Sequence, residues 1–196
     1  MTPKIREILE WRAKYGMLEM DELEAITECL LTFNWGLNDI IVEIGSYKGR
    51  TVQMMAAVLA TVGLTPKIVS IDAFDRVVPV KGMNCRGSYD QAAQNIVSAG
   101  LGKQSIIISA FSDDAVDFIP ARVGFLIIDG WHDYRQCHSD LVNYTPKLLP
   151  GAHALVDDYC SRYPGVIDAV DKFAARNEAG VELAAKLNKG VILRKV

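Results

Sequence analysis

From residue 39 onward, short apolar runs alternate with stretches of helical periodicity. The apolar runs are IIVEI (40–44), KIVSI (67–71), SIIIS (105–109), VGFLII (123–128) and AHALV (152–156). The helical stretches lie near 49–62, 89–100, 112–119, 133–146 and 165–177. Continuous apolar strands separated by helices indicate a parallel sheet that is covered on both faces. We therefore predict a doubly wound, Rossmann-like α/β fold with helices on both faces.

The C-terminal end departs from this alternation. The segments VELAAKL (181–187) and GVILRKV (190–196) are separated by too few residues for a helical crossover. They predict an antiparallel hairpin at the edge of a mostly parallel, seven-stranded sheet.

The N-terminal end predicts two helices, one between Thr2 and Gly16 and one near 21–33. We expect residues 1–38 to form a helical extension or lid, and 39–196 to carry the ligand site within what is a single domain overall. The longest stretch without periodicity, 75–88, is a further candidate lid.

Composition narrows the class of protein. The chain has 196 residues, half of them apolar, and a net charge of -3, which gives no general attraction to nucleic acid or to an anionic membrane. It shows no signal peptide and no apolar run of membrane-spanning length. The four cysteines form no CxxC pair, which favours reduced thiols in a cytoplasmic protein. A homo-oligomer is compatible with all of these features.

Polar residues follow the predicted strands, and the carboxyl ends of parallel strands share one edge, where ligands bind. After the first strand, Gly45 and Gly49 form a GxxxG turn in place of the GxGxxG that admits a pyrophosphate. This spacing favours a nucleoside ligand without phosphates, and Glu43 would suit a ligand ammonium group. Asp72, after the second strand, could accept both hydroxyls of a ribose. The alternatives are a plain glycine turn and an Asp that caps a helix.

Three carboxylates, Asp129, Asp157 and Asp158, follow the fourth and fifth strands. Grouped anions repel unless a proton or a cation intervenes, and magnesium prefers such oxygen ligands. His132 follows Asp129 by three residues and is a candidate general base. The alternatives are carboxylates that cap helices and a histidine that only donates structural hydrogen bonds.

The segments VEIGSYKGRTV, SIDAFD, SAFSDDAVDFI and LIIDGWHDYRQCHSDLVNYTPKLLPGAHALVDDY together resemble the class I S-adenosylmethionine-dependent methyltransferases. The similar branch comprises small-molecule O-methyltransferases that act on sugars, natural products and catechols, and the resemblance covers roughly 39–196. It implies transfer of a methyl group to a small-molecule hydroxyl, with magnesium or another divalent cation assisting.

The resemblance also implies a role for each matching residue. The methionine end of the cofactor would be held by Glu43, Gly45, Ser46 and Gly49. The ribose and adenine would contact Asp72, Ala73 or Phe74, Ala110, Phe111 and Ser112, with Asp129 beside the cofactor. Magnesium would bind Asp129, Asp157 and Asp158, and His132 would be the base.

Two positions depart from the family pattern. Gly151-Ala152 replaces a usual Gly-Gly, and Asp158 stands where catechol enzymes have Asn. Asp158 therefore favours a sugar or natural-product acceptor. Three alternatives stay open: a nicotinamide-dependent oxidoreductase, a non-catalytic cofactor-binding module, and a metal-independent methyltransferase.

Overall fold

The computed structural model describes residues 1–74 and 89–196, without the side chain of Glu178, and within them one seven-stranded sheet organises the chain. The strands are β1 (Ile40–Ile44), β2 (Lys67–Asp72), β3 (Ser105–Ser109), β4 (Val123–Ile128), β5 (Leu148–Val156), β6 (Val181–Lys186) and β7 (Val191–Lys195). Their order in the sheet is β3-β2-β1-β4-β5-β7-β6. The expected loop at 75–88 lies outside the described residues.

The sheet is parallel from β3 to β5 and antiparallel in its last two pairs. β1 pairs with β2 and with β4, and the order of the strands reverses at this point. β7 is antiparallel to both β5 and β6, so it lies between them. The predicted doubly wound sheet with an antiparallel C-terminal hairpin is confirmed.

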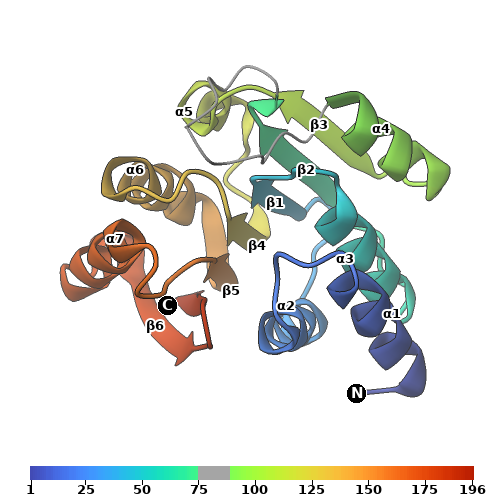
Figure 1. The fold of residues 1–196 in the computed structure, drawn as a ribbon, viewed down its shortest axis with the longest axis horizontal. Coiled ribbons are helices and arrows are strands. Elements are labelled where there is room, and N and C mark those ends of the chain that lie inside the picture. The colour runs from blue at the N-terminus through green and yellow to red at the C-terminus, as the bar shows by residue number, and fades with distance from the viewer. Residues whose placement is uncertain (75–88) are drawn as a thin grey trace.

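Helices cover both faces of the sheet, as Figure 1 shows. The α-helices are α1 (Pro3–Ala13), α2 (Met20–Thr32), α3 (Arg50–Ala60), α4 (Tyr89–Ser98), α5 (Ser112–Ala115), α6 (Tyr134–Tyr144) and α7 (Pro164–Ala175). Single 3-10 turns are η2 (Val116–Phe118), η3 (Thr145–Lys147) and η4 (Glu178–Gly180). Side chains of α5, α6 and α7 belong to one buried cluster, and those of α1, α2, α3 and α4 to the other. Alternate residues of each central strand enter one cluster or the other, as a sheet buried on both faces requires.

The two N-terminal helices form part of the core. Leu9 of α1 and Leu30 of α2 are fully buried. They share a cluster with Ile41 of β1 and Phe125 of β4. The two helices of residues 1–38 therefore pack on one face of the sheet.

Two elements differ from the sequence prediction. The helix expected over 112–119 ends as α5 and continues as the tighter η2, because Ile119 precedes Pro120 and is extended. β5 begins at Leu148, four residues before the predicted run. Pro150 and Gly151 interrupt the apolar pattern, and the pairing with β4 shifts register in this segment.

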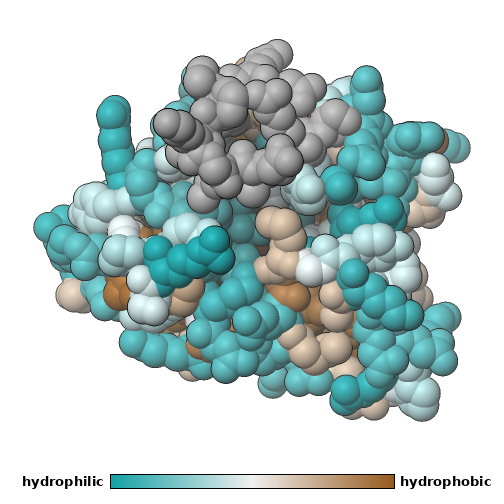
Figure 2. Space-filling view, in the orientation of Figure 1, coloured by the Kyte–Doolittle hydropathy of each residue, from teal (hydrophilic) through white to brown (hydrophobic). Residues whose placement is uncertain are grey.

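The hydropathy of the visible surface and the state of the described cysteines are those of an ordinary globular protein. Figure 2 shows hydrophilic residues over most of the face in view and a limited hydrophobic area near its centre. The described cysteines, Cys29, Cys137 and Cys160, are free thiols. In the described part of the chain, no helix is both long and apolar enough to cross a membrane.

Candidate active site

The turn after β1 brings two strand ends into contact. Gly45 has a φ of +89°, and its N–H donates to the carbonyl of Ile71 over 2.9 Å. A Cβ at Gly45 would lie 1.8 Å from the carbonyl oxygen of Asp129. No residue other than glycine fits there, so the GxxxG turn places the end of β1 directly against the end of β4.

Glu43 provides a buried negative charge next to this turn. Its Oε2 accepts a hydrogen bond from Ser70 over 2.8 Å, and burial raises the pKa of Glu43 to about 7. Ser46 Oγ is also buried near Glu43 and has no hydrogen-bond partner of good geometry among the described residues. Gly49, at a φ of +68°, starts α3. A buried carboxylate beside an unsatisfied hydroxyl fits a ligand that carries an ammonium and a carboxylate, such as the methionine end of S-adenosylmethionine.

Asp72 ties the first two strand ends together. Its Oδ2 accepts from the N–H of Tyr47 and its Oδ1 from the N–H of Phe74, each over 2.7 Å. Each oxygen retains a lone pair, so the carboxylate fits the two hydroxyls of a ribose. Ala73 is half-buried, and the buried ring of Phe74 packs edge-on against Tyr89.

The loop after β3 borders the same edge. Ala110 donates its N–H to the carbonyl of Asp72 over 3.1 Å, and the Phe111 side chain is exposed. Ser112 Oγ donates to Oδ1 of Asp140 over 2.6 Å. Asp140 is fully buried in α6, and this burial raises its pKa to about 6. The hydrogen bond from Ser112 therefore anchors this loop to the buried carboxyl group of Asp140, which the sequence pattern did not indicate.

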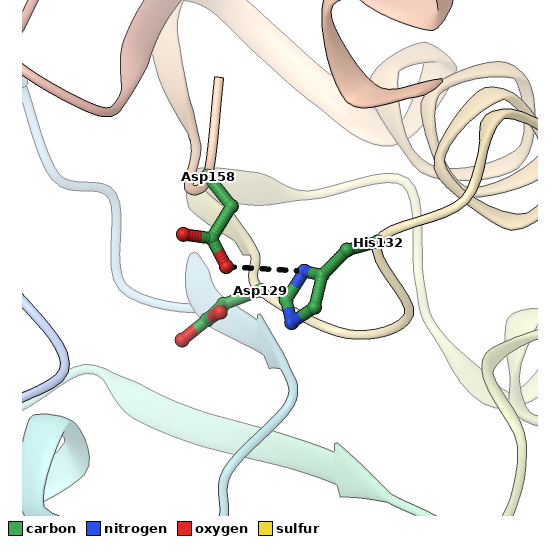
Figure 3. Close-up of side chains that lie close together, drawn as sticks. All are labelled: Asp129, His132 and Asp158. Carbon is green, nitrogen blue, oxygen red and sulfur yellow. Dashed lines mark ion pairs between the residues drawn. The ribbon is translucent and has the colours of Figure 1, made fainter. Parts of the chain in front are cut away.

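Asp129 and His132, from the loop after β4, come together with Asp158, from the loop after β5 (Figure 3). One ligand atom from each lies within 4.8 Å of the other two. His132 Nδ1 lies 3.3 Å from Asp158 Oδ2. Loss of hydration and the neighbouring charges of Asp157 and Asp158 raise the pKa of Asp129 well above its usual value. Two carboxylates and an imidazole form a donor set that fits a divalent cation.

The Asp157 carboxylate forms an ion pair with a lysine. Its side chain is buried, and its Oδ1 and Oδ2 accept from Nζ of Lys189 over 2.9 and 3.1 Å. The expected metal set of Asp129, Asp157 and Asp158 therefore shares one edge, but the group that gathers around His132 contains only the first and the last.

Three charged residues near the site were not predicted from the sequence. Lys189 lies in the turn between β6 and β7, Glu22 in the first turn of α2, and Arg12 in α1. Arg12 is buried, with Nε and Nη2 donating to Thr51 Oγ1 over 3.3 and 3.1 Å. Its place on an otherwise apolar helical face was the available signal, because an unpaired arginine is rarely buried.

The family comparison agrees with this geometry. The profile of a family described as a methyltransferase domain matches residues 42–159, which is more than half of the chain. The chain therefore belongs to the methyltransferase-domain family and is a class I, S-adenosylmethionine-dependent methyltransferase. This result favours methyl transfer over the nicotinamide alternative. Among curated proteins, none matches the sequence.

Solved structures share the fold at low sequence identity. The O-methyltransferase NovP is 22% identical, with a TM-score of 0.76 over 92% of this chain and 82% of its own. An O-methyltransferase from Bacillus cereus, in complex with SAH, is 17% identical, with a TM-score of 0.66 over 100% and 91%. A TDP-rhamnose 3'-O-methyltransferase of calicheamicin biosynthesis is 17% identical, with a TM-score of 0.62 over 99% and 95%. These likenesses establish the class I methyltransferase fold.

Proposed function

We propose that the chain methylates a hydroxyl oxygen of a small molecule, a sugar or a natural product, with a divalent cation such as magnesium assisting. The observation that carries this proposal is the convergence of Asp129, His132 and Asp158 on the edge that also holds Gly45 and Asp72. The names of the structural neighbours, which include O-methyltransferases and a sugar O-methyltransferase, support oxygen as the acceptor atom.

The cofactor is assigned to the first three strand ends. Glu43, Gly45, Ser46 and Gly49 would hold the methionine end, and Asp72 the ribose. Ala73, Phe74, Ala110, Phe111 and Ser112 would enclose the adenine, with Asp129 beside them. S-adenosylmethionine supplies the methyl group that the substrate oxygen takes up.

His132 is the proton acceptor in this proposal. Asp158 contacts Nδ1 of the ring, which orients the imidazole and leaves Nε2 to accept a proton. Asp129 and Asp158 are the carboxylates assigned to the cation. When bound, a divalent ion would hold the substrate oxygen and lower its pKa. We further propose that residues 1–38 and 75–88 contribute to an acceptor pocket and a lid. We expect the enzyme in the cytoplasm.

The test is methyl transfer from labelled S-adenosylmethionine to a panel of nucleotide sugars and phenolic hydroxyls. For the best acceptor, we expect His132→Gln to lower kcat by a factor of about 10² to 10⁴, the usual contribution of a general base. The dissociation constant for S-adenosylhomocysteine should stay within about threefold, because His132 pairs with Asp158 and is not itself assigned to the cofactor.

The matched control is His153→Gln, since His153 lies on β5 near Arg194 and away from the carboxyl edge. Turnover by this variant should equal that of the unmodified enzyme. Full activity of His132→Gln would remove the proposed base. Full activity in EDTA would remove the cation from the proposal and leave a metal-independent methyltransferase.

A further inference from the structure

Lys189 inserts its ammonium group among the carboxylates at the end of β5. Its Nζ lies 2.9 Å from Asp157 Oδ1, 3.6 Å from Glu22 Oε2 and 3.8 Å from Asp158 Oδ1. Only 20% of its side chain is exposed. Among the lysines and arginines of the described residues, Lys189 alone forms ion pairs with Asp157, Glu22 and Asp158.

The fold fixes the position of this lysine. On one side of it, the N–H of Asn188 donates to Asp21 Oδ2 over 2.8 Å, and Nζ itself contacts the carbonyl of Met17. On the other side, a Cβ at Gly190 would lie 2.7 Å from Glu22 Oε1. The turn is therefore packed directly on the start of α2, and most of the Lys189 side chain is buried there.

The negative charge of the carboxylates around Lys189 explains why a buried ammonium group is stable at this position. Asp129, Asp157, Asp158 and Glu22 place four carboxyl groups together. The Glu22 side chain is fully buried beside Asp157, and its Oε1 has no hydrogen bond of good geometry among the described residues. Such a group is unstable unless positive charge or protons compensate it. Lys189 provides one permanent positive charge and occupies both oxygens of Asp157.

We propose that Lys189 is an internal counter-cation that reserves Asp157, so that the carboxylates holding a divalent ion at this centre are those of Asp129 and Asp158 alone, and His132 stays free to act as the base. This inference rests on the proposed function of the site. Removing one partner of a buried ion pair leaves the other uncompensated. Without the lysine, Asp157 would therefore become available as a third carboxylate ligand, and the centre would attract a divalent ion more strongly. Lys189 is thus a positioning residue that sets the affinity of the centre for the ion.

The experiment measures binding of Mn²⁺ to the full chain by electron paramagnetic resonance, without reference to activity. We expect Lys189→Met to lower the Kd for Mn²⁺ at least tenfold. The double variant Lys189→Met/Asp157→Asn should return to within threefold of the unmodified protein, because the gain comes from the freed carboxylate. Lys189→Arg, which keeps the charge, should also stay within threefold.

Lys67→Met is the matched control, since Lys67 starts β2 at the opposite edge of the sheet and is exposed. Its Kd should not change. If Lys189→Met does not fold, Lys189→Gln decides, because glutamine can still donate to Met17 and Asp157 but carries no charge. Binding of Mn²⁺ that appears only in the neutral variants would contradict a cation site on Asp129 and Asp158 in the unmodified protein.

The proposal would be overturned if the neutral variants bound Mn²⁺ no more tightly than the unmodified protein. It would also be overturned if Lys189→Met and the double variant gained the same affinity for Mn²⁺. Failure of the proposed function looks different: S-adenosylhomocysteine would not bind or no hydroxyl acceptor would be methylated, whatever the affinity for Mn²⁺.

Discussion

Of the glycines in the described part of the chain, Gly45 has the least room for a side chain. Gly45→Ala would force a Cβ to 1.8 Å from the backbone of Asp129, and neither strand end can move away without breaking the sheet. We expect a loss of roughly 3 kcal/mol or more in the free energy of unfolding. Urea denaturation measures it.

Gly63→Ala is the matched control, because Gly63 also has a positive φ, of +75°, but no atom within 4 Å of its Cβ position. It should lose only about 1 kcal/mol, the strain of the backbone conformation itself. Equal losses in the two variants would show that the contact with Asp129 is unimportant.

Asp140 gives a prediction on pH. Burial raises its pKa to about 6, from about 4 in an unfolded chain. The folded state therefore binds more protons between these values, and this residue's contribution to stability falls as the pH rises from about 4 to about 6. Asp140→Asn has no charge to bury, so from pH 4 to pH 7 its stability relative to the unmodified protein should increase by up to about 3 kcal/mol. Urea denaturation at the two pH values measures this difference, and a constant difference would contradict it.

At the scale of single residues, the sequence predicted which side chains meet at the carboxyl edge of the sheet, but not which of them form ion pairs there. Asp72, Asp129 and Asp158 are found at one edge because each follows a strand, and strand ends were readable from apolar runs. The ion pair between Asp157 and Lys189 could not be predicted from the sequence. It joins a strand end to a hairpin turn, and nothing local to Asn188, Lys189 and Gly190 distinguishes their turn from a solvent-exposed one.

At the scale of elements, α2 tests whether the N-terminal helices belong to the core. Leu30 is fully buried against the sheet, and Leu30→Ala should lower the free energy of unfolding by roughly 2–5 kcal/mol. Leu37 is 99% exposed, so Leu37→Ala should change it by less than about 0.5 kcal/mol. Chemical denaturation compares them, and a small loss for Leu30→Ala would make residues 1–38 a peripheral addition.

The elements themselves were largely predictable, because a sheet buried on both faces imposes continuous apolar runs. The prediction failed where local chemistry competed with this pattern. Pro150 and Gly151 concealed the first half of β5, and Pro120 shortened the helix after β3 into α5 and η2. Which face α1 and α2 would cover depends on their packing against the sheet, which periodicity does not encode.

The whole molecule should be stabilised by its cofactor product. S-adenosylhomocysteine at about 100 times its Kd should add roughly 2.7 kcal/mol to the free energy of unfolding. For a chain of this size, the melting temperature would rise by roughly 5–11 °C, measured by a thermal melt. NADH should produce no shift, and a shift with NADH alone would revive the oxidoreductase alternative.

The position of β7 between β5 and β6 has a consequence for biosynthesis. The ribosome releases this strand after β6, although β6 reaches the sheet only through it. A nascent chain thus exposes the free edge of β5, with Asp157 not yet paired with Lys189, until the hairpin of β6 and β7 has emerged. Pairing of Asp157 with Lys189 and completion of the sheet by β7 are accordingly expected to occur together during synthesis.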